Sequence, residues 1–414
     1  LVALVYFCQS DCTELVSHLN SFSTRRYLLD VLIRSCDPNV FFVMQPFPSI
    51  LRKWRYGFIL SLLLTLALIF YNCSSERKYV HYGTGRHSLS ITSTQLHQPS
   101  EYHHKNFPDD ALDRDLIFNI NGNDVIVFLH IQKTGGTTLG KHLTRNLDLS
   151  SPCECIKTHK RCSCYRPSSK HQIWLFSRMS TGWLCGLHAD WTELQGCVPE
   201  AMDKKERIKL YFYITMVRNP VSRYISEWRH TQRGATWKMS RHMCGGHAAT
   251  EEQVPRCFKG STWMGVTLND FMSCPHNMAN NRQTRMLADL TLVNCYNKTG
   301  MSTQDRNLIM LASAKANLQS MAFFGLTEFQ RESQYLFERT FKIKFNTPLY
   351  QSNLTIANAS PMQESDMEAV RAVNPLDLEL YAFAKDLFFQ RYHFMKLMER
   401  EERENNGHHP RINS

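Results

Sequence analysis

The sequence predicts an α/β fold in which a central parallel sheet is flanked by helices. From residue 124 onward, short apolar runs alternate with longer amphipathic runs. The first pair is separated by a turn that contains Gly135 and Gly136. Strands that alternate with helices are typical of parallel sheets, because the connection between parallel strands usually contains a helix.

Individual elements follow from the same patterns. The expected strands are short, mostly apolar runs, which cover residues 125–129, 172–177, 210–217 and 321–325. The expected helices show apolar residues at helical spacing, and they cover residues 139–147, 221–232, 304–321, 328–341 and 378–404. The last helix becomes strongly charged, so we expect its last turns to be solvated and residues 399–414 to form a disordered tail.

The turn after the first strand has the composition of an anion site. Lys133 supplies a charge, and Thr134, Thr137 and Thr138 supply hydroxyls. Backbone N–H groups at a helix N-terminus face a ligand there, and the helix dipole favours negative charge. The lysine precedes the glycines, so the G-x-x-x-x-G-K-[ST] order of ATP-binding loops is absent. This order favours another phosphate-bearing donor.

A second turn with a similar character follows the strand expected at residues 210–217. Arg218 comes directly after this strand, and Pro220 opens the next helix at a position that favours proline. Ser226 lies about two helical turns further on. Ligands of open α/β sheets bind at the carboxyl ends of the strands, which predicts that Arg218 faces the ligand edge.

Composition limits the partners without selecting one. A chain of 414 residues can bury a substantial core, and its 43% hydrophobic content is ordinary for globular proteins. The net charge of +11 and the pI near 9.0 favour a polyanion, whether nucleic acid, anionic lipid or sulfated glycan.

The cysteines indicate an oxidising compartment. Ten of the fourteen lie between Cys153 and Cys295, and an even number there predicts disulfides whose pairing the sequence leaves open. Zinc is the alternative for Cys-x-Cys at residues 153–155 and 162–164, but zinc sites usually space their cysteines more widely.

An apolar run at residues 56–71 predicts a membrane anchor. Arg52, Lys53 and Arg55 precede it, and about 16 residues is short against the roughly 20 expected for a span. A signal peptide is the alternative, but residues 71–75 match a cleavage site poorly. The basic flank predicts a cytoplasmic N-terminus and a type II protein, and a short span suits the early secretory pathway, so we expect the Golgi.

The domain organisation follows from this anchor. Residues 1–43 precede the first methionine, Met44, and are expected to be a non-native upstream extension or part of the cytoplasmic tail. Residues 44–55 are then a cytoplasmic tail, 72–120 a polar stem linker and 121–398 a lumenal domain. Four N-x-[ST] sequons fit a lumenal location, at Asn72, Asn297, Asn353 and Asn358.

Five blocks of sequence resemble the heparan sulfate 6-O-sulfotransferases, which use 3'-phosphoadenosine-5'-phosphosulfate (PAPS). Between about residues 124 and 400 these blocks are FLHIQKTGGTT, WLFSRMSTGWLCGLHADWTEL, RNPVSRYISEWRHTQRGATWK, NNRQTRMLADLTLV and MAFFGLTEFQRESQYLFERTF. The resemblance implies a P-loop-like sulfotransferase fold and transfer from PAPS to the 6-O position of glucosamine in heparan sulfate. It implies neither a metal nor a nucleic-acid partner.

The resemblance also implies the donor site. The phosphosulfate loop comprises His130, Ile131, Gln132, Lys133, Thr134, Gly135, Gly136, Thr137 and Thr138. The 3'-phosphate contacts are Arg218 and Ser226. The adenosine-side loop comprises Tyr350, Gln351, Ser352, Ile356 and Ala357. The chain departs from the family at Asn219, where Asp is common, and at Ile356, where the loss of an arginine removes a guanidinium from the donor contacts.

His188 is the expected general base. Imidazole accepts a proton near neutral pH, as removal of the 6-hydroxyl proton requires, and His188 lies in the family's G-x-H-A-D-W block. His130 is the alternative base and is assigned to donor binding, while Lys133 is expected to stabilise charge on the leaving phosphate. Cations and flat rings suit a sulfated sugar chain; the implied acceptor residues are Lys160, Arg161, Arg178, Trp183, His188, His230 and Trp237.

Three other functions remain open at this point. A P-loop kinase needs the Walker order and a carboxylate for magnesium, and neither is found in context. A non-catalytic heparin-binding or nucleic-acid-binding protein accounts for the basic charge but not for two phosphate-binding turns. A sulfotransferase that acts at another glycosaminoglycan position is the closest alternative, because the 6-O assignment depends entirely on the resemblance.

Overall fold

The computed structural model describes residues 106–202, 209–350 and 362–407. All of them belong to one compact unit, residues 91–414. The predicted anchor at residues 56–71 and most of the predicted stem lie outside the described residues. Among the described helices, none is both long enough and apolar enough to cross a membrane.

A four-stranded parallel sheet forms the centre of the unit, as predicted. Its strands are β1 (Val125–Leu129), β6 (Leu175–Phe176), β7 (Tyr211–Val217) and β10 (Phe323–Leu326), in the order β10-β7-β1-β6. All five residues of β1 are buried. Strands that are buried on both faces have continuously apolar sequences, and for this reason β1 could be recognised from the sequence.

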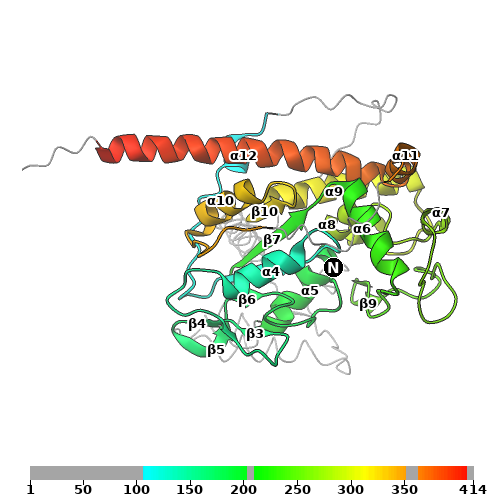
Figure 1. Cartoon of the computed structure of the whole chain (residues 1–414), viewed down its shortest axis with the longest axis horizontal. Coiled ribbons are helices and arrows are strands. Elements are labelled where there is room, and N and C mark those ends of the chain that lie inside the picture. The colour runs from blue at the N-terminus through cyan, green and yellow to red at the C-terminus, as the bar shows by residue number, and fades with distance from the viewer. Residues whose placement is uncertain (1–105, 203–208, 351–361, 408–414) are drawn as a thin grey trace, which may run out of the picture. The chain divides into compact units, whose positions relative to one another are not determined.

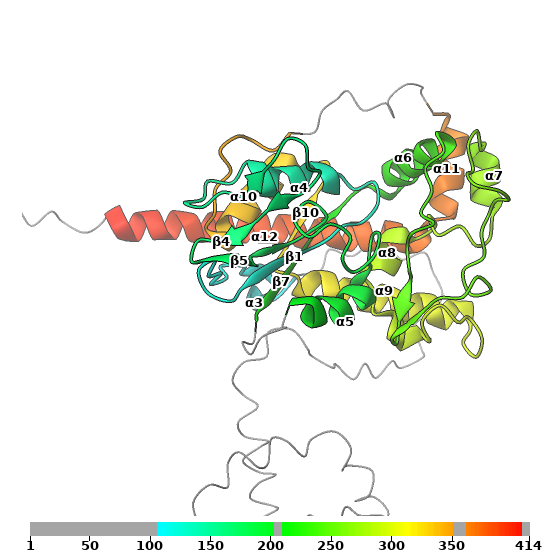
Figure 2. The same ribbon diagram turned by 90° about the horizontal axis from the view of Figure 1, so that it is seen from below.

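Helices cover the sheet and build a second, smaller core. The longest, α12 (Pro375–Gly407), packs against α9 (Thr303–Ser320), α10 (Gln330–Phe341) and β10 (Figure 1). At one end of the unit α6 (Pro220–Gln232), α7 (Leu268–Ser273) and α11 (Glu364–Ala372) lie together (Figure 2). Their shared apolar cluster includes Tyr224, Phe271 and Val370.

The remaining described elements are short, apart from two helices near the site. These two are α4 (Gly136–Arg145) and α5 (Trp191–Met202). The short helices are α3 (Asp109–Leu112), α8 (Arg282–Leu287) and the 3₁₀ helix η4 (Leu290–Val293). The antiparallel hairpins are β2 (Glu154–Cys155) with β3 (Cys162–Ser163), β4 (Tyr165–Arg166) with β5 (Ser169–Ile173), and β8 (Met243–Cys244) with β9 (His247–Ala248).

Three predicted boundaries need correction. The strand expected at 172–177 is divided, because its first residues pair in the β4–β5 hairpin and only Leu175–Phe176 joins the main sheet. The end of the predicted stem packs on the unit, since Phe107 and Leu112 are buried and the Phe107 ring contacts Phe383 of α12. The tail expected to be disordered from residue 399 is helical to Gly407.

Ion pairs explain why the charged end of α12 stays helical. Glu399 pairs with Lys396 and Arg403, which are three and four residues away on the same helix. Glu402 pairs with Arg339 of α10 at 2.8 Å. Alternating charges at these spacings support a helix, so a strongly charged composition did not by itself indicate disorder here.

The predicted disulfides are confirmed for all ten cysteines between residues 153 and 295. The pairs are Cys153–Cys164, Cys155–Cys162, Cys185–Cys197, Cys244–Cys295 and Cys257–Cys274.

Candidate active site

The loop between β1 and α4 forms a cradle with positive potential. Lys133 and Gly135 have left-handed backbone conformations, with φ of 65° and 78°, so the chain turns sharply before the helix begins at Gly136. No side chain caps this end of α4. Its first N–H groups are therefore available to an anion, in line with the positive end of the helix dipole.

Neighbouring strands hold this loop in place. The Thr327 hydroxyl, just after β10, donates to the Thr134 carbonyl at 2.7 Å. Arg218, just after β7, donates from Nη1 to the Lys133 carbonyl at 3.1 Å. The carboxyl ends of three adjacent strands thus meet at the loop, which is where ligands bind in α/β sheets.

Gln283 fixes the backbone of Arg218. Its side-chain oxygen accepts a hydrogen bond from the Arg218 N–H and its amide nitrogen donates to the Arg218 carbonyl, both at 2.9 Å. Asn219 then caps α6 by accepting from the Ser222 N–H at 3.1 Å, so an amide serves where the family commonly has Asp. Ser226 is buried two turns into α6.

Several cations surround the loop. Burial lowers the pKa of Lys133, nearby Arg233 and Arg218 lower it further, and Glu227 acts in the opposite direction. Burial also lowers the pKa of His230, and Lys133 contributes to that shift. Cations held close together repel one another, and a polyanionic ligand relieves this repulsion. The cations around the loop therefore fit a phosphate-bearing ligand such as PAPS.

His188 is held as a neutral base. Its Nδ1 lies 2.8 Å from the His130 carbonyl. A carbonyl only accepts, so Nδ1 carries the proton and Nε2 keeps a free lone pair in the neutral ring. Burial lowers the pKa of His188 to about 4, against a partial offset from that hydrogen bond. The backbone φ of 52° is unusual for histidine, as is common at functional sites.

His130 occupies a more enclosed place than His188. Its ring stacks on Phe128 at 5.5 Å and on Trp183 at 5.7 Å, and it meets the His188 ring at 4.9 Å. Burial places its pKa well below the usual value, with further lowering by His188 and Arg178. A Cβ at Gly136 would approach the His130 ring to 2.4 Å, so the ring lies directly against the start of α4.

Most of the residues that were expected to bind the acceptor glycan lie around His188. Its ring contacts Trp183 at 4.5 Å and Trp237 at 5.2 Å. The Arg178 guanidinium lies 5.2 Å from the centre of the Trp183 ring, and His230 contacts Trp237 at 5.6 Å.

Other predicted positions lie at the edge of the site or outside the described residues. Lys160 and Arg161 are exposed, and Arg161 donates to the Thr181 carbonyl at 3.3 Å. Tyr350 is exposed, and its ring contacts His142 at 5.9 Å. Positions that fall outside the described residues are Gln351, Ser352, Ile356, Ala357, Asn72, Asn353 and Asn358. Asn297 lies in a described turn, where its side chain accepts from the Thr299 N–H and hydroxyl.

A buried ion network was not predicted from the sequence. The Glu227 carboxylate pairs with Arg223 and Arg282 and accepts from Trp237 Nε1 at 3.0 Å. Burial alone would raise the pKa of Glu227, but the two arginines reverse this and lower it to about 2. The network joins the helix that carries Ser226 to a tryptophan beside His188. Its only signal in the sequence was the i, i+4 spacing of Arg223 and Glu227.

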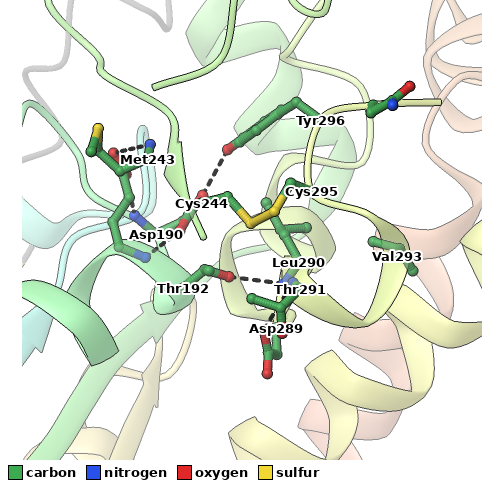
Figure 3. Close-up of a disulfide and its surroundings, with 12 residues drawn as sticks. Asp190, Thr192, Met243, Cys244, Asp289, Leu290, Thr291, Val293, Cys295 and Tyr296 are labelled. Carbon is green, nitrogen blue, oxygen red and sulfur yellow. Dashed lines mark hydrogen bonds between the residues drawn. A yellow bond between two sulfur atoms is a disulfide. The ribbon is translucent and has the colours of Figure 1, made fainter. Parts of the chain in front are cut away.

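A second buried cluster supports the loop that carries His188 (Figure 3). Asp190 and Glu193 cap each other's N–H groups at the start of α5, at 3.0 and 2.9 Å. Tyr296 donates to Asp190 at 2.8 Å, and the Cys244–Cys295 disulfide anchors the neighbouring strand. Within the described ranges, no group of three or more His, Cys, Asp or Glu side chains has the arrangement of a metal site.

The chain is similar in sequence to known sulfotransferases. A sulfotransferase family model matches residues 117–384. The chain is 51% identical over 370 residues to heparan-sulfate 6-O-sulfotransferase 3-B of Danio rerio. This match covers 84% of the chain and 88% of the relative. It is 56% identical over 302 residues to heparan-sulfate 6-O-sulfotransferase 2 of Gallus gallus, with 72% and 75% covered. Against heparan-sulfate 6-O-sulfotransferase 1 of Homo sapiens it is 55% identical over 301 residues, with 72% and 73% covered.

Proposed function

The chain belongs to the sulfotransferase family, and on that premise we propose that it transfers a sulfuryl group from PAPS to the 6-O position of glucosamine in heparan sulfate. One observation carries the proposal. A neutral histidine, His188, has an unprotonated Nε2 beside an anion-binding loop. Its Nδ1–H donates to the carbonyl of His130, the residue that leads into that loop.

His188 acts as the base in this proposal. Its Nε2 takes the proton of the acceptor hydroxyl, while Nδ1–H remains bonded to the His130 carbonyl and keeps the ring oriented. The low pKa means that the ring is unprotonated in neutral solution and ready to accept this proton. Burial is the largest cause of the low pKa, and a low pKa makes His188 a weaker base. Close placement of the acceptor hydroxyl at Nε2 compensates for this weakness.

The donor loop binds the anionic part of PAPS. Lys133, the first N–H groups of α4 and Arg218 hold its phosphates, together with Ser226, which is buried two turns into α6. Bound PAPS supplies the sulfuryl group and a phosphate on which negative charge develops during transfer. Lys133 and the helix N–H groups belong to one loop that the fold holds in place, so little reorganisation is needed when such charge forms.

We also propose a type II protein of the Golgi membrane with its catalytic domain in the lumen. The apolar run at residues 56–71 and its basic flank support this orientation. Five disulfides suit an oxidising compartment, and the Asn297 sequon lies in a turn. Resistance to carbonate extraction and glycosylation at Asn297 are expected. A mature N-terminus shortly after Ser75 in all material would indicate signal cleavage instead.

Transfer of radiolabel from PAPS tests the function. The acceptor is N-sulfated heparan sulfate that lacks 6-O-sulfate, and the product is digested to disaccharides to locate the label. Label on the glucosamine 6-O is expected. Label at another position would retain the sulfotransferase and reject the regiochemistry. Tight heparin binding without any transfer would indicate a non-catalytic binding protein.

A further inference from the structure

A cavity of about 280 Å³ lies beside Trp237, and most of its lining residues take no part in the function described so far. Its walls are formed by the end of α6, the segment from there to α7, and the residues between α7 and the start of α8. Residues that line it include Lys238, Arg241, Thr250, Phe258 and Trp263. The Cys257–Cys274 disulfide joins two parts of this wall. A space of this size suits a single sugar unit.

The lining carries an excess of positive charge. Its cations are Lys238, Arg241, Arg256 and Arg282, and its carboxylates are Glu227 and Glu251. Arg282 is bound to Glu227 and Arg256 lies 3.4 Å from Glu251, so these four charges compensate one another.

Lys238 and Arg241 provide the excess. Lys238 donates to the neutral Gly260 carbonyl at 3.1 Å, and no carboxylate pairs with it within the described residues. Arg241 is exposed, and within the described residues it has neither a hydrogen bond nor an ion pair that would neutralise it. His242 also lines the cavity, but burial lowers its pKa to about 3, so it adds no charge at neutral pH. Two uncompensated cations at one concave surface favour an anionic ligand.

Aromatic rings give the cavity flat walls. Phe258 and Trp263 stack at 5.7 Å, and the Trp237 indole, fixed by its bond to Glu227, forms another wall. Rings with an apolar face beside cations suit a sugar that carries sulfate or carboxylate groups, because the faces of a sugar are apolar and its substituents are charged.

The cavity adjoins the catalytic base. Trp237 lines the cavity and contacts the His188 ring at 5.2 Å. Ser240 donates to the Leu187 carbonyl at 2.9 Å, and Arg241 lies against Gly186 in the same loop. A chain whose reacting hydroxyl lies at His188 can therefore continue past Trp237 into the cavity.

We propose that this cavity is an additional acceptor subsite, in which Lys238 and Arg241 bind a sulfated or uronic acid unit of the same glycan beside the reacting glucosamine. The inference rests on the proposed function. Arg178 lies over the Trp183 ring and Arg161 donates to the Thr181 carbonyl close by in the chain, whereas the cavity is lined by Trp237. The two groups bind different units of the chain, so affinity should increase with acceptor length until the cavity is filled.

The test uses the Lys238→Ala/Arg241→Ala double variant and N-sulfated oligosaccharides of increasing length. Loss of two charge-assisted contacts should raise KM for an octasaccharide by about tenfold or more, with a smaller rise for shorter acceptors. Arg400→Ala is the control, because this exposed arginine belongs to the C-terminal turns of α12. That end of α12 lies away from α7 and β9 (Figure 1). Its KM should equal that of the wild type at every length.

A direct measurement of oligosaccharide binding tests the subsite independently of turnover. Calorimetry with an octasaccharide already sulfated at 6-O should show about tenfold weaker binding to the double variant than to Arg400→Ala. Loss of affinity that is equal at all lengths, or the same in both variants, would overturn the subsite. If the wild type bound the octasaccharide normally but transferred no sulfate, the proposed function would fail while the subsite was still judged by this affinity.

Discussion

Gly136→Ala should impair catalysis through contact with His130. A methyl group at Gly136 would lie 2.4 Å from His130 Cδ2 and 2.6 Å from Nε2, far inside a normal contact. The histidine cannot easily yield, because Phe128 and Trp183 stack on it and His188 meets its ring. Overpacking of this kind costs about 1–3 kcal/mol. The ring or the loop must shift, which disturbs both the donor cradle and the carbonyl that orients His188.

The assay compares Gly136→Ala with Gly140→Ala in the same helix. At Gly140 the added methyl group would lie 3.1 Å from a flexible methionine side chain, Met179, so α4 can accept it and gain helix propensity. We expect Gly136→Ala to lower kcat/KM by at least about tenfold and to weaken binding of 3'-phosphoadenosine 5'-phosphate, while Gly140→Ala stays near the wild type. Wild-type kinetics and donor-product affinity in Gly136→Ala would refute the reasoning.

Four further predictions concern single side chains. Lys133→Ala should abolish transfer, at a cost on the order of 3 kcal/mol or more in transition-state stabilisation, and wild-type turnover in a folded variant would contradict this. Gln283→Ala removes both bonds to the Arg218 backbone and should weaken donor-product affinity about tenfold in calorimetry, with Gln283→Glu intermediate. The folded pKa of Glu227, about 2, lies below its usual 4.5, so its stabilisation is complete above pH 4.5 and is lost as pH falls toward 2. Urea unfolding should show a decline on the order of 3 kcal/mol that Glu227→Gln lacks. The pKa of His188, about 4, predicts that kcat/KM keeps its neutral value down to about pH 5 and is lost as the ring gains its proton; an inflection near 6.5 would contradict this.

The elements that the sequence predicted are those with strong local signals. The strand Val125–Leu129 is apolar throughout, and α6 begins with a proline and an asparagine cap. Both were predicted to within a residue or two. The short strand β6 was not separated from the hairpin before it, since periodicity does not show which partner a strand pairs with. The helix α11 went unrecognised, because it buries only Val370.

The candidate site could be proposed from the sequence only where its residues lie in recognisable loops. Lys133, Arg218 and His188 stand in motifs that the sequence displays. Gln283 and Glu227 act through partners far along the chain, at Arg218 and Arg282, and no local pattern reveals such contacts. The pairing of the cysteines was also beyond the sequence, because it depends on which loops the fold brings together.

The role of His188 as the base is tested most directly by its replacement with alanine. Turnover should fall by about 10²–10⁴-fold, while calorimetry shows nearly unchanged affinity for 3'-phosphoadenosine 5'-phosphate. His130→Ala should weaken that affinity as well, because its ring lies against the start of α4. Full turnover in His188→Ala, together with a loss of turnover alone in His130→Ala, would contradict the account and exchange the roles of the two histidines.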